Sequence, residues 1–490
     1  MATPTLPTLD SATLDPADWS ALRAQGHRML DDILDYAEHI RERPVWQPIP
    51  DEVRAKFQQG LPQGEGDLVA VHQQFMQDIL PYSVGNSHPG FMGWVQGGGN
   101  PVGTLAEMLA AGLNANLGGR NHIPIDVERQ VSRWVSTLFG FPETASGLFV
   151  TGTSMANFIA VLVARSVALG TEVRKTGLAS YEQRLVAYTS AGAHGCIAQA
   201  MDIAGIGRDA LRMIPMTSQF EMDTALLREA IAADRAAGLT PFFIAGTAGS
   251  VDVGAIDDLT TLAEIAAQEK IWFHIDGAFG ALAMLSPELA PRLAGIERAD
   301  SVAFDFHKWM QVPYDAGFIL VRNREAHLAT FSAPVGYLRR ETRGLAGGSP
   351  WPCDFGPDLS RGFRALKTWF TLQVYGTERL GQMIAHTCEL AQYLKQQVEE
   401  NPKLELLAPV NLNIVCFRYR SDLCADLDAL NADIVVALHE GGICAPSTTF
   451  IRGQLAIRAA IVNHRTRAED IDALINATIA QGDLLAQSAQ

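Results

Sequence analysis

The spacing of apolar residues divides the 490-residue chain into three stretches. In residues 1–85 the apolar positions recur at helical spacing, most clearly over 19–40, and proline-rich turns then interrupt them. This stretch holds too few apolar residues to form a core alone. We therefore expect a helical segment that packs on another element, such as a second subunit.

Residues 86–365 alternate short apolar runs with helical stretches, of which 155–168 and 259–268 are the clearest. The runs are rich in β-branched and aromatic residues and lack strict alternation, which is typical of strands buried on both faces. Seven strands are predicted, at 148–150, 185–188, 211–215, 242–245, 271–275, 301–304 and 318–321. Strands that alternate with helices indicate an α/β domain with a mostly parallel sheet.

The pattern changes after residue 365. A long helix is predicted through 380–398, and the elements after it are a strand at 414–417, a helix at 426–439, a strand at 455–461 and a helix near 471–479. This order indicates a smaller α+β domain over 366–490.

Composition narrows the range of functions. Acidic residues outnumber basic ones by 54 to 38, which weighs against nucleic acid and anionic membranes as partners. No apolar run has the length of a membrane span, and residues 1–15 lack the basic and apolar regions of a signal peptide. The six cysteines are scattered and no metal-binding spacing occurs. We expect a cytoplasmic protein with reduced thiols and no metal.

A lysine just past a predicted strand is the strongest chemical signal. Lys308 follows the strand at 301–304 and has aromatic neighbours in Phe306 and Trp309. Apolar surroundings favour the neutral form of an amine, which imine chemistry requires. The alternative is a solvated lysine at a strand end. His307, beside it, suits either contact with a phosphate or carboxylate or a place in the core.

An aspartate closes the predicted strand at 271–275. A buried carboxylate is costly without a partner, so Asp276 needs a cationic group nearby. That group is either an arginine or the protonated nitrogen of a pyridine ring, which would make the ring an electron sink. The small residues Gly277 and Ala278 leave room for a flat ring.

Two further features lie at strand ends. His194 follows the strand at 185–188, where open α/β sheets bind ligands, and is either a ring-stacking group or a structural histidine. The turn at 151–157 is rich in hydroxyls and precedes an apolar helix, so it is either a phosphate site or an ordinary helix cap. It is not a Walker A loop, and the glycine-rich stretch at 97–101 lacks the spacing of a dinucleotide fingerprint.

Together these features follow one order along the chain: an anion-binding turn, a histidine, a buried aspartate and a strand-end lysine. In this the sequence resembles the group II pyridoxal-phosphate-dependent amino-acid decarboxylases, best known from the aromatic-L-amino-acid decarboxylases. The resemblance extends from His88 through the C-terminal region and is most specific at 274–278 and 307–309, with 360–370 adding to it.

The resemblance implies the α/β fold of the fold type I pyridoxal-phosphate-dependent transferases, which is aspartate aminotransferase-like. Its parts would be a large domain over 86–365 with a mixed, mostly parallel sheet, and a small α+β domain over 366–490. Residues 1–85 would pack across a homodimer with shared active sites. The segment 113–117 would reach the partner's site.

The resemblance also assigns roles to residues. Lys308 would carry pyridoxal 5′-phosphate as an imine, and Asp276 would hold the pyridinium N–H. His194 would stack on one ring face, with Ala278 under the other. The remaining implied contacts are Thr153 and Ser154 at the phosphate, Thr247 near the ring substituents, His307, and Asp305 at a position where relatives often carry asparagine.

One implied catalytic residue lies in a stretch of different character. Residues 332–352 are rich in glycine, proline and arginine, which is typical of a mobile lid. Within it, Tyr337 corresponds to the loop tyrosine that returns a proton to the substrate carbon in decarboxylases. An exposed loop aromatic is the alternative.

The implied reaction converts an L-amino acid, most simply an aromatic one, to an amine and CO₂. Gly97 occupies the place of a substrate-contacting threonine in aromatic relatives and would give space without a hydroxyl, although Phe91 and Trp94 lie close by in sequence. Other amino acids therefore stay open as substrates.

Three other functions remain as alternatives. Oxygen-dependent aldehyde synthases of this scaffold tend to change the loop tyrosine or the stacking histidine, and Tyr337 and His194 are both present here. An aminotransferase is disfavoured by the residues around Asp276 and Lys308. A non-catalytic binding protein of this fold is disfavoured by the intact set of catalytic residues.

Overall fold

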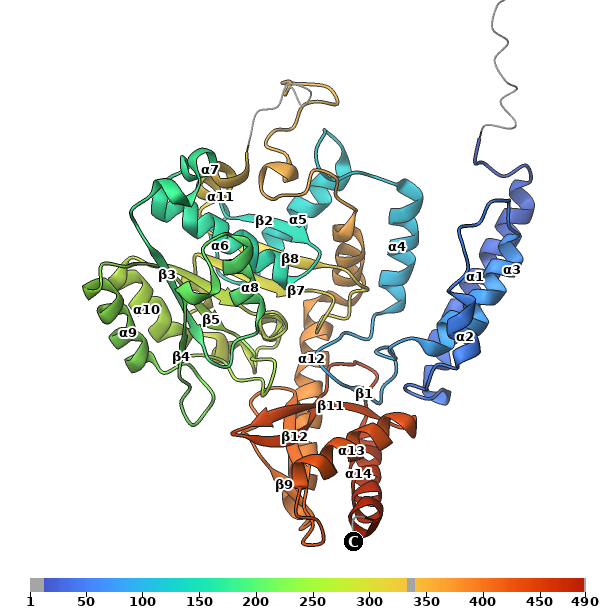
Figure 1. Cartoon of the computed structure of the whole chain (residues 1–490). Coiled ribbons are helices and arrows are strands. Elements are labelled where there is room, and N and C mark those ends of the chain that lie inside the picture. The colour runs from blue at the N-terminus through green and yellow to red at the C-terminus, as the bar shows by residue number, and fades with distance from the viewer. Residues whose placement is uncertain (1–12, 333–339, 489–490) are drawn as a thin grey trace, which may run out of the picture.

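The computed structural model of the chain describes residues 13–332 and 340–488 (Figure 1). A seven-stranded sheet forms its centre, in the order β2-β8-β7-β6-β5-β3-β4. Strands β3 to β7 pair in parallel, whereas β8 is antiparallel to both of its neighbours. The strands are β2 (Ser146–Val150), β3 (Leu185–Ser190), β4 (Leu211–Ile214), β5 (Thr240–Thr247), β6 (Trp272–Asp276), β7 (Ser301–Asp305) and β8 (Gly317–Val321). All seven predicted strands are present, and the predicted mostly parallel α/β fold is confirmed.

Helices cover both faces of this sheet, as the apolar character of its strands predicts. Along β2, Leu148 and Val150 join one apolar cluster with α6 and α8, while Phe149 between them joins a second cluster on the other face. The helices around the sheet are α4 (Pro101–Leu113), α5 (Ile123–Leu138), α6 (Thr153–Leu169), α7 (Val173–Thr176), α8 (Cys196–Ile203), α9 (Thr224–Ala236), α10 (Leu259–Glu269) and α11 (Arg324–Phe331).

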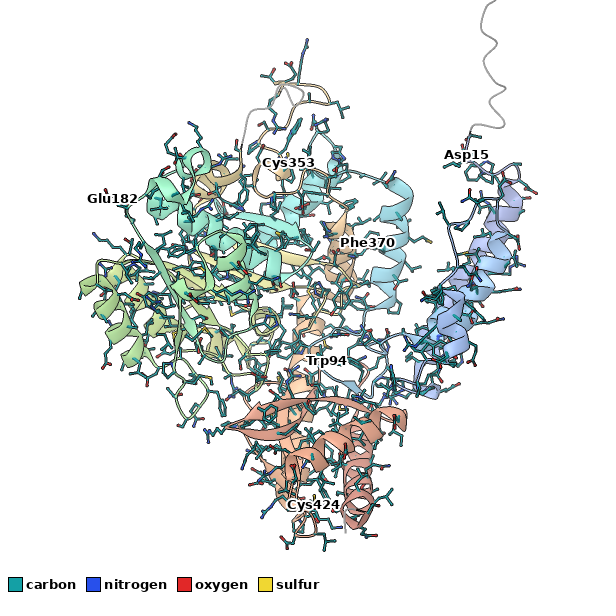
Figure 2. All side chains as sticks on the ribbon, viewed as in Figure 1. Asp15, Trp94, Glu182, Cys353, Phe370 and Cys424 are labelled. Atoms are coloured by element: carbon teal, nitrogen blue, oxygen red, sulfur yellow. The ribbon has the colours of Figure 1, made fainter. Side chains whose placement is uncertain are left out.

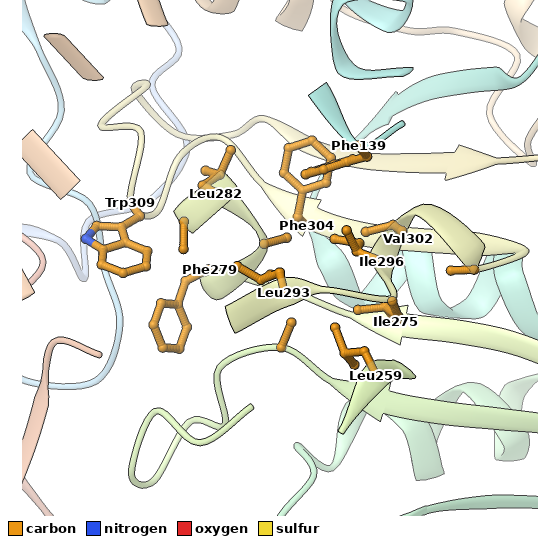
Figure 3. Packing of buried hydrophobic residues seen from close by; sticks show 14 of the residues in the cluster. Phe139, Leu259, Ile275, Phe279, Leu282, Leu293, Ile296, Val302, Phe304 and Trp309 are labelled. Atoms are coloured by element: carbon orange, nitrogen blue, oxygen red, sulfur yellow. The ribbon is translucent and has the colours of Figure 1, made fainter. Parts of the chain in front are cut away.

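The second cluster reaches the ends of β6 and β7. Figure 3 shows Phe279 and Trp309 in it, with their ring centroids 5.5 Å apart. Phe279 comes three residues after Asp276, and Trp309 directly follows Lys308. The backbone that carries these two polar residues is therefore anchored in the core.

A buried ion pair fastens the region of the sequence motif at 360–370. The guanidinium of Arg361 donates to the carboxylate of Glu128 at 2.5 and 3.1 Å and to the carbonyl oxygens of Leu117 and Phe149. Both ion-paired side chains are almost fully buried. This part of the motif therefore joins α5, β2 and the segment after α4.

A smaller five-stranded sheet has the order β1-β11-β12-β10-β9. Its strand β1 pairs in parallel with β11, so two residues from the first quarter of the chain complete a C-terminal sheet. The long helix α12, which begins at the predicted boundary, packs against α4 and α5 of the large part and also against β9, β10 and α14. The elements are β1 (Phe91–Met92), α12 (Arg364–Glu400), β9 (Leu404–Leu406), β10 (Ile414–Tyr419), α13 (Leu427–Glu440), β11 (Ala445–Ile451), β12 (Gln454–Ala460) and α14 (Ala468–Ser488).

The N-terminal helices stand beside the body of the molecule (Figure 1). They are α1 (Trp19–Glu38), α2 (Asp51–Lys56) and α3 (Leu68–Gln74). The only buried residue of α1 is Gln25, and α3 has none. Within the described residues, α1 and α3 therefore contribute almost no buried apolar side chains. No helix in residues 13–332 or 340–488 is long and apolar enough to cross a membrane.

Candidate active site

A cavity of about 450 Å³ opens at the carboxyl ends of β5, β6 and β7. This is the edge at which parallel sheets of α/β proteins bind ligands. The structure brings together there nine residues singled out from the sequence: Thr153, Ser154, His194, Thr247, Asp276, Ala278, Asp305, His307 and Lys308. The tenth, Tyr337, lies outside the described residues.

Lys308 is paired with the carboxylate of Asp305, because β7 ends at Asp305 and the turn after it brings the lysine back. The distance from Lys308 Nζ to Asp305 Oδ2 is 3.0 Å, and His307 Nε2 lies 3.6 Å from the same oxygen. Asp305 is almost fully buried, whereas the lysine side chain is partly exposed to the cavity. The other carboxylate oxygen accepts from the N–H of Thr153 at 2.7 Å. Asp305 thus ties the lysine to the turn before α6.

The ring of His307 is held in one tautomer. Its Nδ1 accepts from the N–H of Ala316 at 3.0 Å, so the ring hydrogen of the neutral form is on Nε2, facing Asp305. Burial lowers the pKa of His307, so the ring is neutral near pH 7. The Tyr314 ring lies against it, with centroids 4.2 Å apart.

Asp276 is buried at the end of β6 and surrounded by neutral donors. It accepts from Asn157 Nδ2 at 3.0 Å, from Cys196 Sγ at 3.5 Å and from the N–H of Ala278 at 3.2 Å. Burial raises the pKa of the Cys196 thiol, which therefore stays protonated and can donate. Within the described part of the chain, Asp276 has no ion pair, and no arginine there is its partner. Its charge is left for a cationic ligand group.

His194 lies at the exposed side of the cavity, directly before α8. Its Nδ1 accepts from the N–H of Cys196 at 3.2 Å, so in the neutral ring Nε2 carries the hydrogen. The same cysteine thus contacts both His194 and Asp276, which fixes the spacing between them. Stacking of His194 on a cofactor ring stays a prediction.

The turn before α6 has the properties of a phosphate site. Thr153 and Ser154 line the cavity at the N-terminus of this 17-residue helix, where the positive end of its dipole lies, and the N–H of Thr153 donates to Asp305. The hydroxyl oxygens of Thr153 and Thr247 are buried and have no hydrogen-bond partner among the described residues. Buried polar atoms are nearly always paired, so two orphans lining one cavity indicate a polar ligand. A methyl group at Gly152 would meet nothing closer than 3.8 Å, which leaves room for that ligand.

The interpretation of Gly97 as added substrate space is wrong. A methyl group at this position would lie 2.2 Å from the carbonyl oxygen of His307 and 2.4 Å from that of Lys308. The glycine therefore allows the segment at 97 to pack directly on the backbone of the lysine turn. Of the two aromatic residues noted near it, Trp94 lines the cavity, whereas Phe91 packs in a small cluster with Val45.

The small sheet completes the cavity wall. Arg458 on β12 donates to the carbonyl oxygens of Trp94, at 3.0 Å, and of Val251, at 2.8 Å. The N–H of Trp94 donates to Ser447 on β11. Figure 2 shows Trp94 where the large and small parts of the molecule meet. Two segments of the wall are thus held by strands of the other sheet.

Several residues of the site were not given a role from the sequence, among them Gln96, Asn157, Cys196, Val251 and Tyr314. Asn157 lies in the conspicuous turn-and-helix motif, and Cys196 follows His194 by two residues, so proximity to a motif was the one available signal. Nothing in the local sequence marks Gln96, Val251 or Tyr314.

Comparison with known proteins assigns the chain to a family. A family profile described as the pyridoxal-dependent decarboxylase conserved domain matches residues 50–420. The chain belongs to the pyridoxal-dependent decarboxylases. It is 31% identical to an aromatic-L-amino-acid decarboxylase of Bacillus atrophaeus over 92% of this chain and 93% of that protein. It is 29% identical to a phenylacetaldehyde synthase of Arabidopsis thaliana, over 91% and 93% of the two chains.

A solved structure agrees with this assignment. Catharanthus roseus tryptophan decarboxylase in complex with L-tryptophan is 25% identical, with a TM-score of 0.86 over 96% of this chain and all of that one. The predicted family, fold, cofactor and reaction class are confirmed: this protein is an amino-acid decarboxylase that uses pyridoxal phosphate. The orphaned hydroxyls, the helix N-terminus beside them and the carboxylate without an ion pair among the described residues fit that cofactor.

Proposed function

We propose that this decarboxylase releases CO₂ from an aromatic L-amino acid at the cavity around Lys308 and Asp276. The observation that carries the proposal is the convergence, in one cavity, of an amine, a buried carboxylate without an ion pair among the described residues, and a helix N-terminus flanked by two unpartnered hydroxyls. Each matches one part of pyridoxal phosphate: the aldehyde, the ring nitrogen and the phosphate. No single one of these groups would be sufficient.

In this proposal each side chain has a separate task. Lys308 attaches the cofactor through Nζ, and Asp276 accepts the N–H of its ring. His194 and Ala278 flank the ring, and Asp305 and His307 hold the turn that carries the lysine. The remaining contacts are those of Thr153 and Ser154 with the phosphate and of Thr247 with the ring substituents.

The bound cofactor supplies an electron sink for the electron pair that remains when CO₂ departs. Asp276 sustains that sink, because a buried carboxylate favours the protonated ring nitrogen. Tyr337 then delivers a proton to the substrate carbon, and the amine leaves.

The apolar part of the cavity supports an aromatic substrate. Trp94, Val95, Val251 and Phe279 line it, and together they offer flat and branched apolar surface to a ring. The 31% identity to an aromatic-L-amino-acid decarboxylase points the same way.

We also propose a homodimer in the cytoplasm. Large apolar side chains are exposed on α1 and α4, among them Trp19 at 59%, Met108 at 52% and Leu113 at 59%, and a second copy would cover them. The segment 113–117 would then approach the partner's site. All six cysteines are unpaired, which fits a reducing compartment.

Product analysis tests the reaction and the substrate together. The purified protein with pyridoxal phosphate is given tyrosine, tryptophan, phenylalanine, histidine and glutamate separately, and CO₂, amine, aldehyde and peroxide are followed. Amine equal to CO₂ with an aromatic substrate supports the proposal. Aldehyde with peroxide would instead make the chain an aldehyde synthase and remove the role of Tyr337. Turnover of histidine or glutamate alone would overturn the aromatic assignment.

A further inference from the structure

A chain of four hydrogen bonds runs through the sheet and ends on Asp276. Trp272 Nε1 lies 2.8 Å from Ser301 Oγ, and the same oxygen lies 2.8 Å from His274 Nδ1. His274 Nε2 lies 2.7 Å from Asn157 Oδ1, and Asn157 Nδ2 lies 3.0 Å from Asp276 Oδ2. The hydrogen bonds thus lead from β6 to β7, back to β6, on to α6 and finally to the last residue of β6.

The two ends of this chain fix its direction. An indole N–H can only donate, so Ser301 Oγ accepts from Trp272. At the other end an ionised carboxylate can only accept, so the amide of Asn157 must turn its NH₂ towards Asp276. The amide oxygen of Asn157 then faces His274.

Only one arrangement satisfies the atoms between the ends. The amide oxygen of Asn157 needs a donor, so His274 carries its hydrogen on Nε2. Its Nδ1 is then an acceptor and takes the hydroxyl hydrogen of Ser301. In each of the four hydrogen bonds, the donor therefore lies on the side of Trp272 and the acceptor on the side of Asp276. Burial lowers the pKa of His274 to about 3, in agreement with a neutral ring.

All members of the chain are shielded from water. Asn157, His274 and Ser301 are each 0% exposed, and Asp276 is 5% exposed. Since water cannot replace a lost partner at such positions, a break in the chain leaves a buried polar group unpaired. The carboxylate therefore has one preferred orientation.

We propose that Asn157 is a positioning residue for Asp276, and that His274, Ser301 and Trp272 set the orientation of its amide. The inference rests on the proposed role of Asp276 as the partner of the cofactor's ring nitrogen. Asn157 follows Thr153 by four residues, one turn along α6. The same helix thus presents its N-terminus to the cofactor phosphate and orients the carboxylate for the ring nitrogen at the other end of the cofactor.

A double-mutant cycle between Asn157 and Asp276 tests this. Asn157→Leu keeps the branched shape of the side chain and removes its three hydrogen bonds, to Asp276, His274 and Cys196. Pyridoxal phosphate is titrated into the apoprotein, and the dissociation constant and the pH midpoint of the bound cofactor's visible band are measured. The single variant should bind about 10- to 100-fold more weakly. In an Asp276→Asn background the same substitution should change the affinity by less than about twofold, because its target is gone.

Ser301→Ala changes a residue that is three hydrogen bonds away from the carboxylate. It should weaken cofactor affinity less than Asn157→Leu but move the same pH midpoint. Ser166→Ala is the matched control, since Ser166 is a buried hydroxyl on α6 without a hydrogen-bond partner among the described residues. It should leave affinity and midpoint unchanged.

The apoprotein offers a readout that does not involve the cofactor. In ring-¹⁵N-labelled histidine spectra, the His274 signal, assigned from its absence in His274→Gln, should show the neutral Nε2–H form between about pH 6 and 8. The Nδ1–H form or a charged ring would overturn the proposed donor-to-acceptor direction of these hydrogen bonds.

The outcomes separate this proposal from the one on which it rests. If Asp276→Asn and Asn157→Leu each weaken cofactor binding and their effects are not additive in the double variant, both proposed roles are supported. If Asp276→Asn weakens binding and Asn157→Leu does not, the positioning role is wrong and the role of Asp276 stands. If Asn157→Leu lowers cofactor affinity equally in the wild-type and Asp276→Asn proteins, Asn157 has only a structural role. No effect of Asp276→Asn would remove the proposed role of Asp276 itself.

Discussion

Replacing Gly97 by alanine tests how closely the segment before α4 packs on the lysine turn. The added methyl group would lie 2.2 and 2.4 Å from two backbone carbonyl oxygens, those of His307 and Lys308. Ordinary contact distances require one segment to retreat by roughly 1 Å. Strain from such overpacking costs about 1–3 kcal/mol of folding free energy. A displacement of about 1 Å at a reacting group can lower the rate on the order of a hundredfold.

The assay compares kcat/KM for CO₂ release with the melting temperature of the same preparation. Gly97→Ala should lose far more activity than its small change in stability explains, because the strain acts on the residue that attaches the cofactor. Gly64→Ala is the matched control, since a methyl group there meets nothing within 4 Å. Wild-type kcat/KM together with a wild-type melting temperature in Gly97→Ala would refute the close packing.

Three further substitutions probe the site, the frame and the pH response. Lys308→Ala should keep the circular dichroism spectrum but lose turnover, and full activity would reject the lysine assignment. Arg361→Met leaves the buried carboxylate of Glu128 unpaired and should lower the free energy of unfolding in urea by about 3–5 kcal/mol, with Glu128→Gln losing less. Burial lowers the pKa of His327 from 6.5 to about 4, so its contribution to stability is present above pH 6.5 and is lost as pH falls towards 4. His327→Leu should therefore reduce the slope of the free energy of unfolding in urea against pH, across that window, by about one bound proton. An unchanged slope would contradict the buried neutral ring.

The strands of the large sheet could be predicted because burial on both faces makes them continuous apolar runs. Three strands of the small sheet could not. β1 has two residues and β9 three, too few for any periodicity, and β11 is polar in its middle. The partner of β1 lies in the last tenth of the chain, and local spacing carries no information on such a pairing.

The residues of the site also differ in whether the sequence alone could reveal them. Lys308, Asp276 and His194 could be found because each stands at a strand end, where parallel sheets bind ligands. The contact between Asn157 and Asp276 could not, since a helical position does not reveal which strand its side chain faces. The tight contact at Gly97 also depends on two segments that are distant in sequence, so its glycine gives the same local signal as an ordinary loop.

The cavity wall has a consequence for how the protein is made. Trp94 is fixed by Ser447, 353 residues later in the chain, and by Arg458 beyond it. At ribosomal speeds of about 5–20 residues per second, roughly 20–70 seconds pass between synthesis of the two halves of this wall. During that interval the strands that hold Trp94 in the cavity wall have not been made. A nascent chain released before β12 would contain Lys308 and Asp276 but would lack a closed substrate site. Translation speed therefore sets the earliest moment at which a newly made molecule can select its substrate.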